Sequence, residues 1–285
     1  MGTRDLIAER DKFAALHPET RHLVNGRDWG VIRAGQRGPA LVLIPGTLGR
    51  ADIFWQQIAV LSKEARILAV SYPASGGISD WAADLAQMIA DAEMQGATVL
   101  GSSLGGYLAQ YLTATEPALC SGLVAANTLA SVRGIDQVPP YALDLVTTPI
   151  DDLRAGFEAG LAGWQFPDHP YRDLAYLLLQ EVRGRIPEGE LRARLQALKT
   201  APDLPAQSLP RDRIFTVQSD DDHLISPPMR ESLRATLNPV RAYRFRAASH
   251  FPYVTRPDAY TGLLRDVLDL PTGQTIWPAG EESLS

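Results

Sequence analysis

The chain has 285 residues, 45% hydrophobic and 21% charged, so it has enough apolar side chain for a large core and too little charge for a disordered protein. Its 33 acidic residues outnumber the 27 basic ones, and no basic run occurs, which argues against nucleic acid as a partner. The single cysteine, Cys120, excludes an internal disulfide and a cysteine zinc site.

The N-terminal stretch, residues 1–19, is charged throughout and lacks the apolar segment of a signal peptide. Leu6 stands at the hydroxyl position of a myristoylation signal, and no apolar run approaches about 20 residues. We therefore expect a cytoplasmic chain with no membrane partner, in which residues 1–20 form a helical segment. The positive charge is nearly all arginine, which we interpret as composition of solvated faces.

Strand and helix patterns alternate through residues 21–131. The segments around Asn25-Gly26 predict an antiparallel hairpin at a sheet edge. Short apolar runs then predict buried parallel strands at 40–45, 67–72, 97–101 and 122–126. Helical periods separate them, at Ile53, Ile58 and Leu61; at Trp81, Leu85, Met88 and Ile89, with Ser79 as N-cap; and at Leu104, Leu108, Tyr111 and Leu112. This order predicts an α/β fold with a parallel sheet covered on both faces.

The pattern changes at residue 132, where prolines begin to separate helical stretches without strand periodicity. We interpret residues 132–210 as a helical lid or cap insertion. Strand periodicity resumes at 213–218 and 240–247, and helical periods follow each of these runs. Residues 21–131 and 211–270 are thus the predicted core, and the tail, 271–285, is expected to lie loosely on the surface.

The strongest chemical signal is Gly101-Ser102-Ser103-Leu104-Gly105, a G-x-S-x-G sequence between a predicted strand and a predicted helix. A serine on such a sharp turn has its hydroxyl pushed out above the sheet, and only glycine fits at the two flanking positions. The helix N-terminus favours a developing negative oxygen. We predict Ser103 as a nucleophile.

A serine nucleophile needs a base and a group that orients the base. His250 follows the last predicted strand, whereas His17 and His22 precede the sheet, His169 lies in the insertion and His223 lies in an acidic turn. The acid is expected after strand 213–218, where three aspartates are consecutive; we choose Asp222, with Asp221 as the alternative. The order Ser, Asp, His is that of α/β-hydrolases.

Two backbone N–H groups must bind the oxyanion that forms when the serine attacks a carbonyl. The first is expected from Leu104, which directly follows the nucleophile. The second is expected from the loop after the first parallel strand, Pro45-Gly46-Thr47, where we choose Thr47.

With these residues in place, the sequence resembles the α/β-hydrolase superfamily over about residues 20–270, and within it the maspardin-like branch. The segments that carry the resemblance are IPGTLGRADIFWQQI, in which Pro45 replaces the histidine of the commoner His-Gly loop, LGSSLGGYLAQYL and SHFPYVTRPDAY. The resemblance implies a mostly parallel eight-stranded sheet with a lid after the sixth strand. Maspardin is regarded as a binding protein that lacks the histidine standing here as His250, so its non-catalytic role does not carry over.

These residues predict a carboxylesterase-like serine hydrolase that forms an acyl-enzyme and requires no metal or organic cofactor. A non-catalytic maspardin-like scaffold, carbon–carbon bond hydrolysis and acyl transfer remain alternatives. The expected partner is a small acyl substrate, ester or thioester, with a monomer or homodimer as the assembly. An uncharged, fairly apolar acyl group is expected to contact aromatic and aliphatic side chains of the insertion, namely Phe157, Leu161, Trp164 and Phe166. At helical spacing the same residues can instead pack the insertion onto the core.

Overall fold

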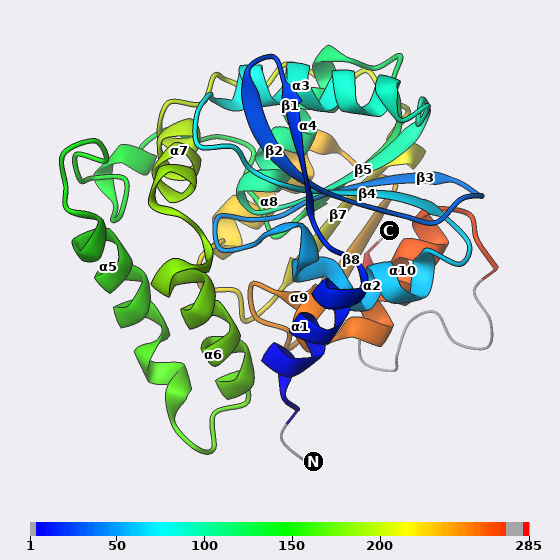
Figure 1. Ribbon diagram of the computed structural model, residues 1–285. Coiled ribbons are helices and arrows are strands. Elements are labelled where there is room, and N and C mark those ends of the chain that lie inside the picture. The colour runs from blue at the N-terminus through cyan, green and yellow to red at the C-terminus, as the bar shows by residue number, and fades with distance from the viewer. Residues whose placement is uncertain (1–3, 272–281, 285) are drawn as a thin grey trace.

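The computed structural model describes residues 4–271 and 282–284, and its centre is one mixed β-sheet (Figure 1). The strand order is β1-β2-β4-β3-β5-β6-β7-β8-β9. Strands β4, β3, β5, β6, β7 and β8 are parallel to one another, and β1, β2 and β9 pair antiparallel at the two edges. The bounds are β1 Thr20–Val24, β2 Arg27–Ala34, β3 Ala40–Ile44, β4 Arg66–Ser71, β5 Ala97–Ser102, β6 Cys120–Ala126, β7 Ile214–Ser219, β8 Arg241–Phe245 and β9 Glu282–Leu284.

The central strands were predictable because both of their faces are covered. All five residues of β3 and all six residues of β5 and of β7 are buried, as expected for continuous apolar runs in a parallel sheet. The predicted hairpin is also present: β1 and β2 pair antiparallel around Asn25 and Gly26, which both have positive φ. The predicted mostly parallel α/β sheet is therefore confirmed.

The sheet gains one strand beyond the eight that were expected. Strand β9, Glu282–Leu284, pairs antiparallel with β8. This strand lies in the tail that we expected to rest loosely on the surface, and the remainder of that tail, residues 272–281 and 285, lies outside the described residues. Three residues without alternating hydrophobicity give no strand signal in a sequence.

Helices cover both faces of the sheet (Figure 1). One face packs against α3 (Ile78–Asp91), α4 (Leu104–Thr115) and α8 (Pro227–Leu237). The other packs against α1 (Leu6–Leu16), the 3-10 turn η1 (Ala51–Phe54), α2 (Trp55–Leu61), α9 (Pro252–Thr255) and α10 (Pro257–Val267).

The N-cap predicted for α3 is wrong. The helix begins at Ile78, and the Asp80 carboxylate accepts a hydrogen bond from the N–H of Gly77 at 3.0 Å. Asp80 thereby caps the helix from its third position, which leaves Ser79 inside the first turn. The Ser79 hydroxyl instead contacts the Tyr111 hydroxyl at 3.2 Å.

The chain between β6 and β7 contains helices and irregular segments. Its main helices are α5 (Ile150–Ala162), α6 (Arg172–Gln180) and α7 (Glu188–Lys199), with a π-helical turn, η4 (Glu181–Arg185), after α6. The short 3-10 turns are η2 (Ile135–Gln137), η3 (Gly163–Gln165) and η5 (Arg211–Arg213). Helices α5, α6 and α7 lie together on one side of the sheet (Figure 1). We refer to residues 132–210 as the helical insertion.

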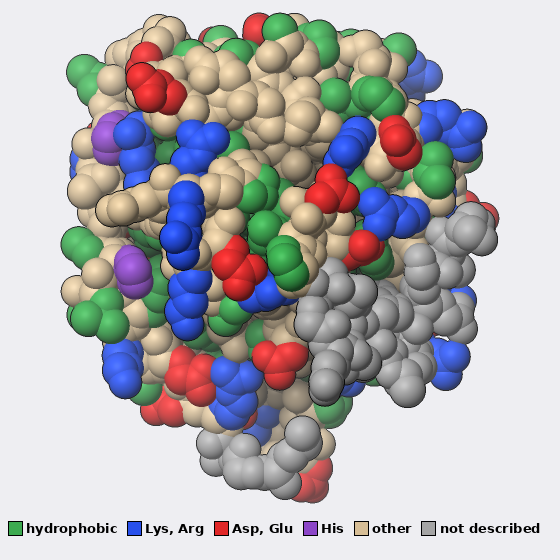
Figure 2. All heavy atoms as spheres, turned by 90° about the vertical axis from the view of Figure 1, so that its right-hand side faces the viewer, with side chains coloured by type: hydrophobic (Ala, Val, Ile, Leu, Met, Phe, Trp, Pro, Cys, Tyr) green, Lys and Arg blue, Asp and Glu red, His purple; other side chains and the backbone are tan. Residues whose placement is uncertain are grey.

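The surface carries charges of both signs. On the face drawn in Figure 2, arginine and lysine side chains are interspersed with aspartate and glutamate, so neither sign covers a large area there. No helix within residues 4–271 combines the length and the apolar character needed to cross a membrane.

Candidate active site

Ser103 occupies a strained turn between β5 and α4. Its backbone has φ 55° and ψ −119°, a conformation that non-glycine residues rarely adopt and that costs about 1–3 kcal/mol. The turn is held by backbone groups: Ser103 N donates to Ala126 O at 3.0 Å, and Ser103 O accepts from the hydroxyl of Thr128 at 2.6 Å. A partly exposed serine is thus fixed at the carboxyl end of β5.

The two glycines of the G-x-S-x-G sequence are required by close packing. A Cβ at Gly101 would lie 1.9 Å from Gly105 O, and a Cβ at Gly105 would lie 2.3 Å from Ile44 O at the end of β3. Backbone atoms cannot move aside as a flexible side chain can. The sharp turn therefore brings α4 directly against the neighbouring strand, which explains both glycines.

His250 and Asp222 form a buried pair. The Nδ1 atom of His250 lies 2.8 Å from Oδ2 of Asp222, and the two side chains are 3% and 0% exposed. Asp222 follows β7 and His250 follows β8, so both come from the carboxyl ends of parallel strands, at the edge where Ser103 follows β5. Within the described residues no hydrogen bond joins Ser103 Oγ to His250. The structure thus brings the predicted acid and base together without closing the contact to the serine.

All four hydrogen-bond partners of the Asp222 carboxylate are donors. Oδ2 faces His250 Nδ1 and the amide nitrogen of Asn127 at 2.9 Å, and Oδ1 accepts from the N–H groups of Leu224 and Ile225 at 2.9 and 3.1 Å. Burial alone would raise the pKa of Asp222, but the charge of His250 and these hydrogen bonds outweigh it and lower the pKa to about 2. Asp222 is therefore a fixed carboxylate.

The alternative acid, Asp221, has a different role. Its Oδ1 accepts from the N–H groups of Ala248 and Ser249, each at 3.0 Å, and its other oxygen accepts from the hydroxyl of Tyr171 in the insertion. Ser249 has φ 55°, so Asp221 stabilises a strained turn directly before His250. Asp221 contacts the segment that carries the base, whereas Asp222 contacts its ring.

The sequence did not predict two contacts of the candidate acids, that of Asn127 with Asp222 and that of Tyr171 with Asp221. Asn127 directly follows β6 and donates a hydrogen bond to Asp222, and its positive φ, 44°, is one that asparagine tolerates better than most residues. A polar residue directly after a buried strand was a usable signal for it. Tyr171 gave no such signal, because its contact with Asp221 joins segments 50 residues apart.

The predicted oxyanion donors come from two chain segments next to the serine. Leu104 is the first residue of α4, so its N–H has no acceptor within the helix. Thr47 follows β3, in a loop that passes directly against the nucleophile: a Cβ at Gly46 would lie 3.1 Å from Ser103 Cβ. The backbone around Ser103 therefore offers N–H groups from two separate segments.

The four predicted pocket residues of the insertion differ in exposure. Leu161 is buried in the core cluster that spans one face of the sheet and the insertion, and Phe157 and Trp164 pack against it. Phe166 is 69% exposed. Leu161, Phe157 and Trp164 thus pack the insertion onto the core. That any of the four residues lines a substrate pocket stays a prediction. Within the described residues no cluster of histidine, cysteine or acidic side chains is arranged to hold a metal ion.

Comparison with known proteins finds a matching family and several relatives. A model of the alpha/beta hydrolase family matches residues 41–263. The polyketide synthase ThaQ of Burkholderia thailandensis is 25% identical in an alignment of 276 positions that covers 90% of this chain and 13% of ThaQ. A pimeloyl-[acyl-carrier protein] methyl ester esterase of Photobacterium profundum is 27% identical over 244 residues, covering 81% of this chain and 95% of the esterase.

Maspardin is also among the relatives. The rat protein is 28% identical over 116 residues, which are 39% of this chain and 44% of maspardin. This chain therefore spans less than half of ThaQ and of maspardin, and the maspardin-like branch stays a prediction. Among solved structures, the enol-lactonase of Burkholderia xenovorans has a TM-score of 0.69 at 19% identity, over 88% of this chain and all of that one. This similarity shows the α/β-hydrolase fold.

Proposed function

Because the chain belongs to the alpha/beta hydrolase family, whose model matches residues 41–263, we propose that it is a serine hydrolase that cleaves carboxylic esters through an acyl-enzyme. The observation that carries this proposal is the buried Asp222–His250 pair at the sheet edge where Ser103 occupies its strained turn. Relatives named as a methyl ester esterase and a carbamate hydrolase support hydrolysis as the reaction class.

In the proposed reaction, Ser103 Oγ attacks the carbonyl carbon of the substrate while Nε2 of His250 takes the serine proton. Asp222 accepts the hydrogen bond from Nδ1, which leaves Nε2 without a proton and free to act as a base. Closing the distance between Ser103 Oγ and Nε2 is expected on substrate binding, since such contacts are often long without substrate.

The negative oxygen that forms is bound by the N–H groups of Thr47 and Leu104. The His250 imidazolium then gives its proton to the leaving alcohol, and the carbon–oxygen bond to that alcohol breaks. Water repeats the sequence: His250 takes a proton from water, hydroxide adds to the acyl carbon, and Ser103 leaves with the proton. Each proton taken by His250 is returned, so the enzyme ends each cycle in its starting protonation state.

An uncharged, fairly apolar acyl group is the proposed substrate. Leu161, Phe157 and Trp164 of the insertion are apolar side chains in or against the core cluster, and we propose that the acyl chain contacts this part of the insertion. Esters graded by acyl chain length test this: kcat/KM should rise with apolar length until the chain exceeds the site. A higher kcat/KM for charged acyl groups than for uncharged ones of the same length would contradict it.

The catalytic proposal is tested with p-nitrophenyl esters and a fluorophosphonate probe that labels activated serines. Ser103→Ala should abolish both hydrolysis and labelling. Ser102→Ala is the matched control, because Ser102 is the adjacent serine and is buried at the end of β5, and it should keep both. Folded wild-type protein that the probe does not label would favour a non-catalytic scaffold instead.

A further inference from the structure

The loop after β3, residues 45–50, is held by a side chain of the helical insertion. Arg194 lies on α7 and is 0% exposed. Its Nη1 donates to Thr47 O at 2.8 Å and to Gly49 O at 2.9 Å. We call residues 45–50 the β3 loop; it contains Thr47, the proposed oxyanion donor.

In the β3 loop, the carbonyl groups of residues 45, 46, 47 and 49 each accept a hydrogen bond. Besides the two bound by Arg194, Pro45 O accepts from the hydroxyl of Tyr72 at 2.7 Å, and Gly46 O accepts from Gly49 N at 3.1 Å. A peptide group is planar, so fixing a carbonyl also fixes the N–H on the other side of the same bond. The Gly46 carbonyl thus orients the N–H of Thr47, which belongs to the same peptide group. The Thr47 carbonyl, which Arg194 holds, fixes the following peptide group, between Thr47 and Leu48.

The guanidinium group of Arg194 is itself held in place. Its Nη2 lies 3.1 Å from Glu190 Oε2, and its Cζ lies 5.1 Å from the centre of the Tyr72 ring. Burial lowers the pKa of Arg194 and the charge of Glu190 opposes this, which leaves a pKa of about 10. The group is a cation at neutral pH. A planar fork with several donors suits this arrangement, and the single ammonium of lysine does not.

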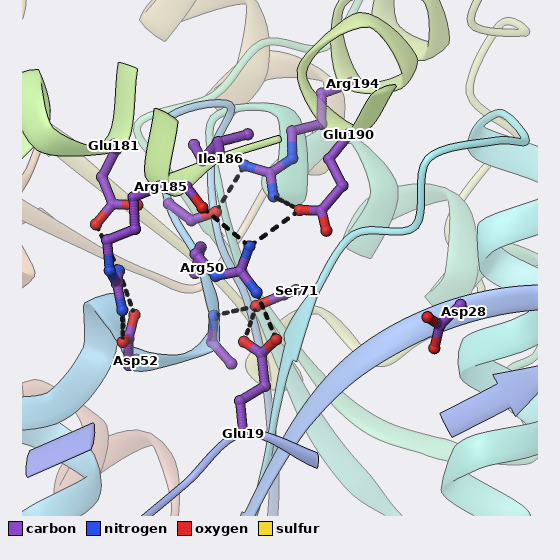
Figure 3. Close-up of polar contacts among 12 residues, drawn as sticks. Glu19, Asp28, Arg50, Asp52, Ser71, Glu181, Arg185, Ile186, Glu190 and Arg194 are labelled. Carbon is purple, nitrogen blue, oxygen red and sulfur yellow. Dashed lines mark hydrogen bonds and ion pairs between the residues drawn. The ribbon is translucent and has the colours of Figure 1, made fainter. Parts of the chain in front are cut away.

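The far end of the β3 loop belongs to the same network (Figure 3). Arg50 lies 3.2 Å from Glu190 Oε2 and 2.5 Å from Glu19 Oε1. Glu19 accepts from the hydroxyl of Ser71 at 2.5 Å, and Ser71 accepts from Ala51 N at 2.8 Å. Charges of opposite sign therefore alternate from α7 across the loop to Glu19, which directly precedes β1, and the Ser71 hydroxyl connects Glu19 to the end of β4.

We propose that Arg194 is a positioning residue of the oxyanion hole: by fixing the Thr47 and Gly49 carbonyls, it holds the β3 loop in the conformation that keeps the Thr47 N–H next to Ser103. This inference rests on the proposed serine hydrolase function. Stability alone does not call for such a residue, since an apolar side chain of similar volume often stabilises a buried position as well as an ion pair does. The geometry of the β3 loop explains the arginine, because a single side chain there donates to both the Thr47 and the Gly49 carbonyl.

The test compares substitutions at Arg194 with the same substitutions at Arg192. Both arginines lie on α7, pair with a glutamate four residues earlier and donate to a backbone carbonyl. The carbonyl bound by Arg192 is Leu145 O, which lies in the insertion and outside the β3 loop. Arg194→Met, Arg194→Lys and the pair Glu190→Gln with Arg194→Met are measured beside Arg192→Met and Arg192→Lys.

Readouts are kcat and KM on the best ester, thermal unfolding, and inhibition by a boronic acid that forms a tetrahedral adduct on serine. We expect Arg194→Met to lower kcat about 10- to 100-fold, because small misplacements of catalytic groups have effects of this size. KM should stay within about threefold, and boronate affinity should fall in parallel with kcat. Arg194→Lys should recover only part of kcat, and the Arg192 variants should stay within about twofold of the wild type.

Folded Arg194 variants with wild-type kcat would overturn the inference. Equal losses of kcat at Arg192 and Arg194 would also overturn it, since they would indicate a general effect of α7. If Arg194→Met does not fold, the double variant without the unpaired glutamate and the lysine variant give the same comparison. Wild-type protein without esterase activity or Ser103 labelling would instead refute the proposed function.

Discussion

Replacing Asp222 by asparagine tests the proposed role of the acid most directly. Oδ1 of Asp222 accepts two backbone N–H groups, so the new amide keeps its oxygen there and turns its NH2 group toward His250 and Asn127. His250 must then accept at Nδ1 and carry its proton on Nε2. With the proton on that atom, the ring cannot take one from Ser103.

The expected loss of activity is much larger than the loss of stability. A base held in the wrong tautomer lowers kcat by about 10⁴-fold, which corresponds to about 5 kcal/mol in the activation barrier. The fold loses less, because Asn127 can rotate its amide and present Oδ1, which has no partner in the structure, to the new NH2 group. The free energy of unfolding should still fall by about 1–2 kcal/mol, because the hydrogen bonds to residue 222 are then made to a neutral amide and no longer to a charged carboxylate.

The assay is kcat/KM on a p-nitrophenyl ester together with urea unfolding. Asp221→Asn is the matched control, since its new NH2 group can donate to the Tyr171 hydroxyl while the other oxygen keeps the N–H groups of Ala248 and Ser249. We expect it to keep at least a tenth of wild-type activity. The reasoning is refuted if Asp222→Asn retains that much, or if Asp221→Asn loses as much as Asp222→Asn does.

Two further predictions concern stability. Gly105→Ala should destabilise the fold by at least about 3 kcal/mol, because its Cβ would lie 2.3 Å from Ile44 O. Gly160→Ala is the control, because Gly160 lies on α5 with open space at the Cβ position, and it should stabilise the fold by about 0.5–1 kcal/mol. Urea unfolding measures both variants, and equal effects would contradict the importance of the close approach between Gly105 and Ile44 O. The second prediction concerns pH: the pKa of Asp222 is lowered from 3.8 to about 2, so its contribution to stability is complete above pH 4 and is lost as the pH falls through 2. Between these values the unfolding free energy of the wild type should fall more steeply than that of Asp222→Asn, by up to about 1.4 kcal/mol per pH unit, and identical slopes would contradict the lowered pKa.

The sheet could be predicted because burial on both faces leaves a strong local pattern. Strands β3, β5 and β7 are short apolar runs that end in turn residues, and the turn at Ser103 is signalled by glycines that close packing demands. Strand β9 has no such pattern, and the beginning of α3 depends on which of two neighbouring polar residues reaches a free N–H. Local sequence therefore indicates that an element exists better than it indicates where the element begins.

Parts of the candidate site depend on contacts that sequence patterns do not encode. Asn127 and Asp222 are 95 positions apart, and Arg194 and Thr47 are 147 apart. Each contact exists because parallel strands end at one edge of the sheet and the insertion returns to that edge. The choice of Asp222 over Asp221 was open for the same reason, since both follow β7 and only the folded turn determines which carboxylate faces His250.

Buried arginines are exceptions to the composition argument. We interpreted the arginines mainly as residues of solvated faces, but Arg10 and Arg194 are 1% and 0% exposed. Arg10 binds Glu181 at 2.9 Å, which ties α1 to the insertion, and Arg194 binds Glu190 and two carbonyls of the β3 loop. A buried cation is tolerated only where most of its donors have acceptors, and guanidinium offers five donors in one plane. In this fold, two buried arginines join the insertion to the core, Arg10 at α1 and Arg194 at the β3 loop.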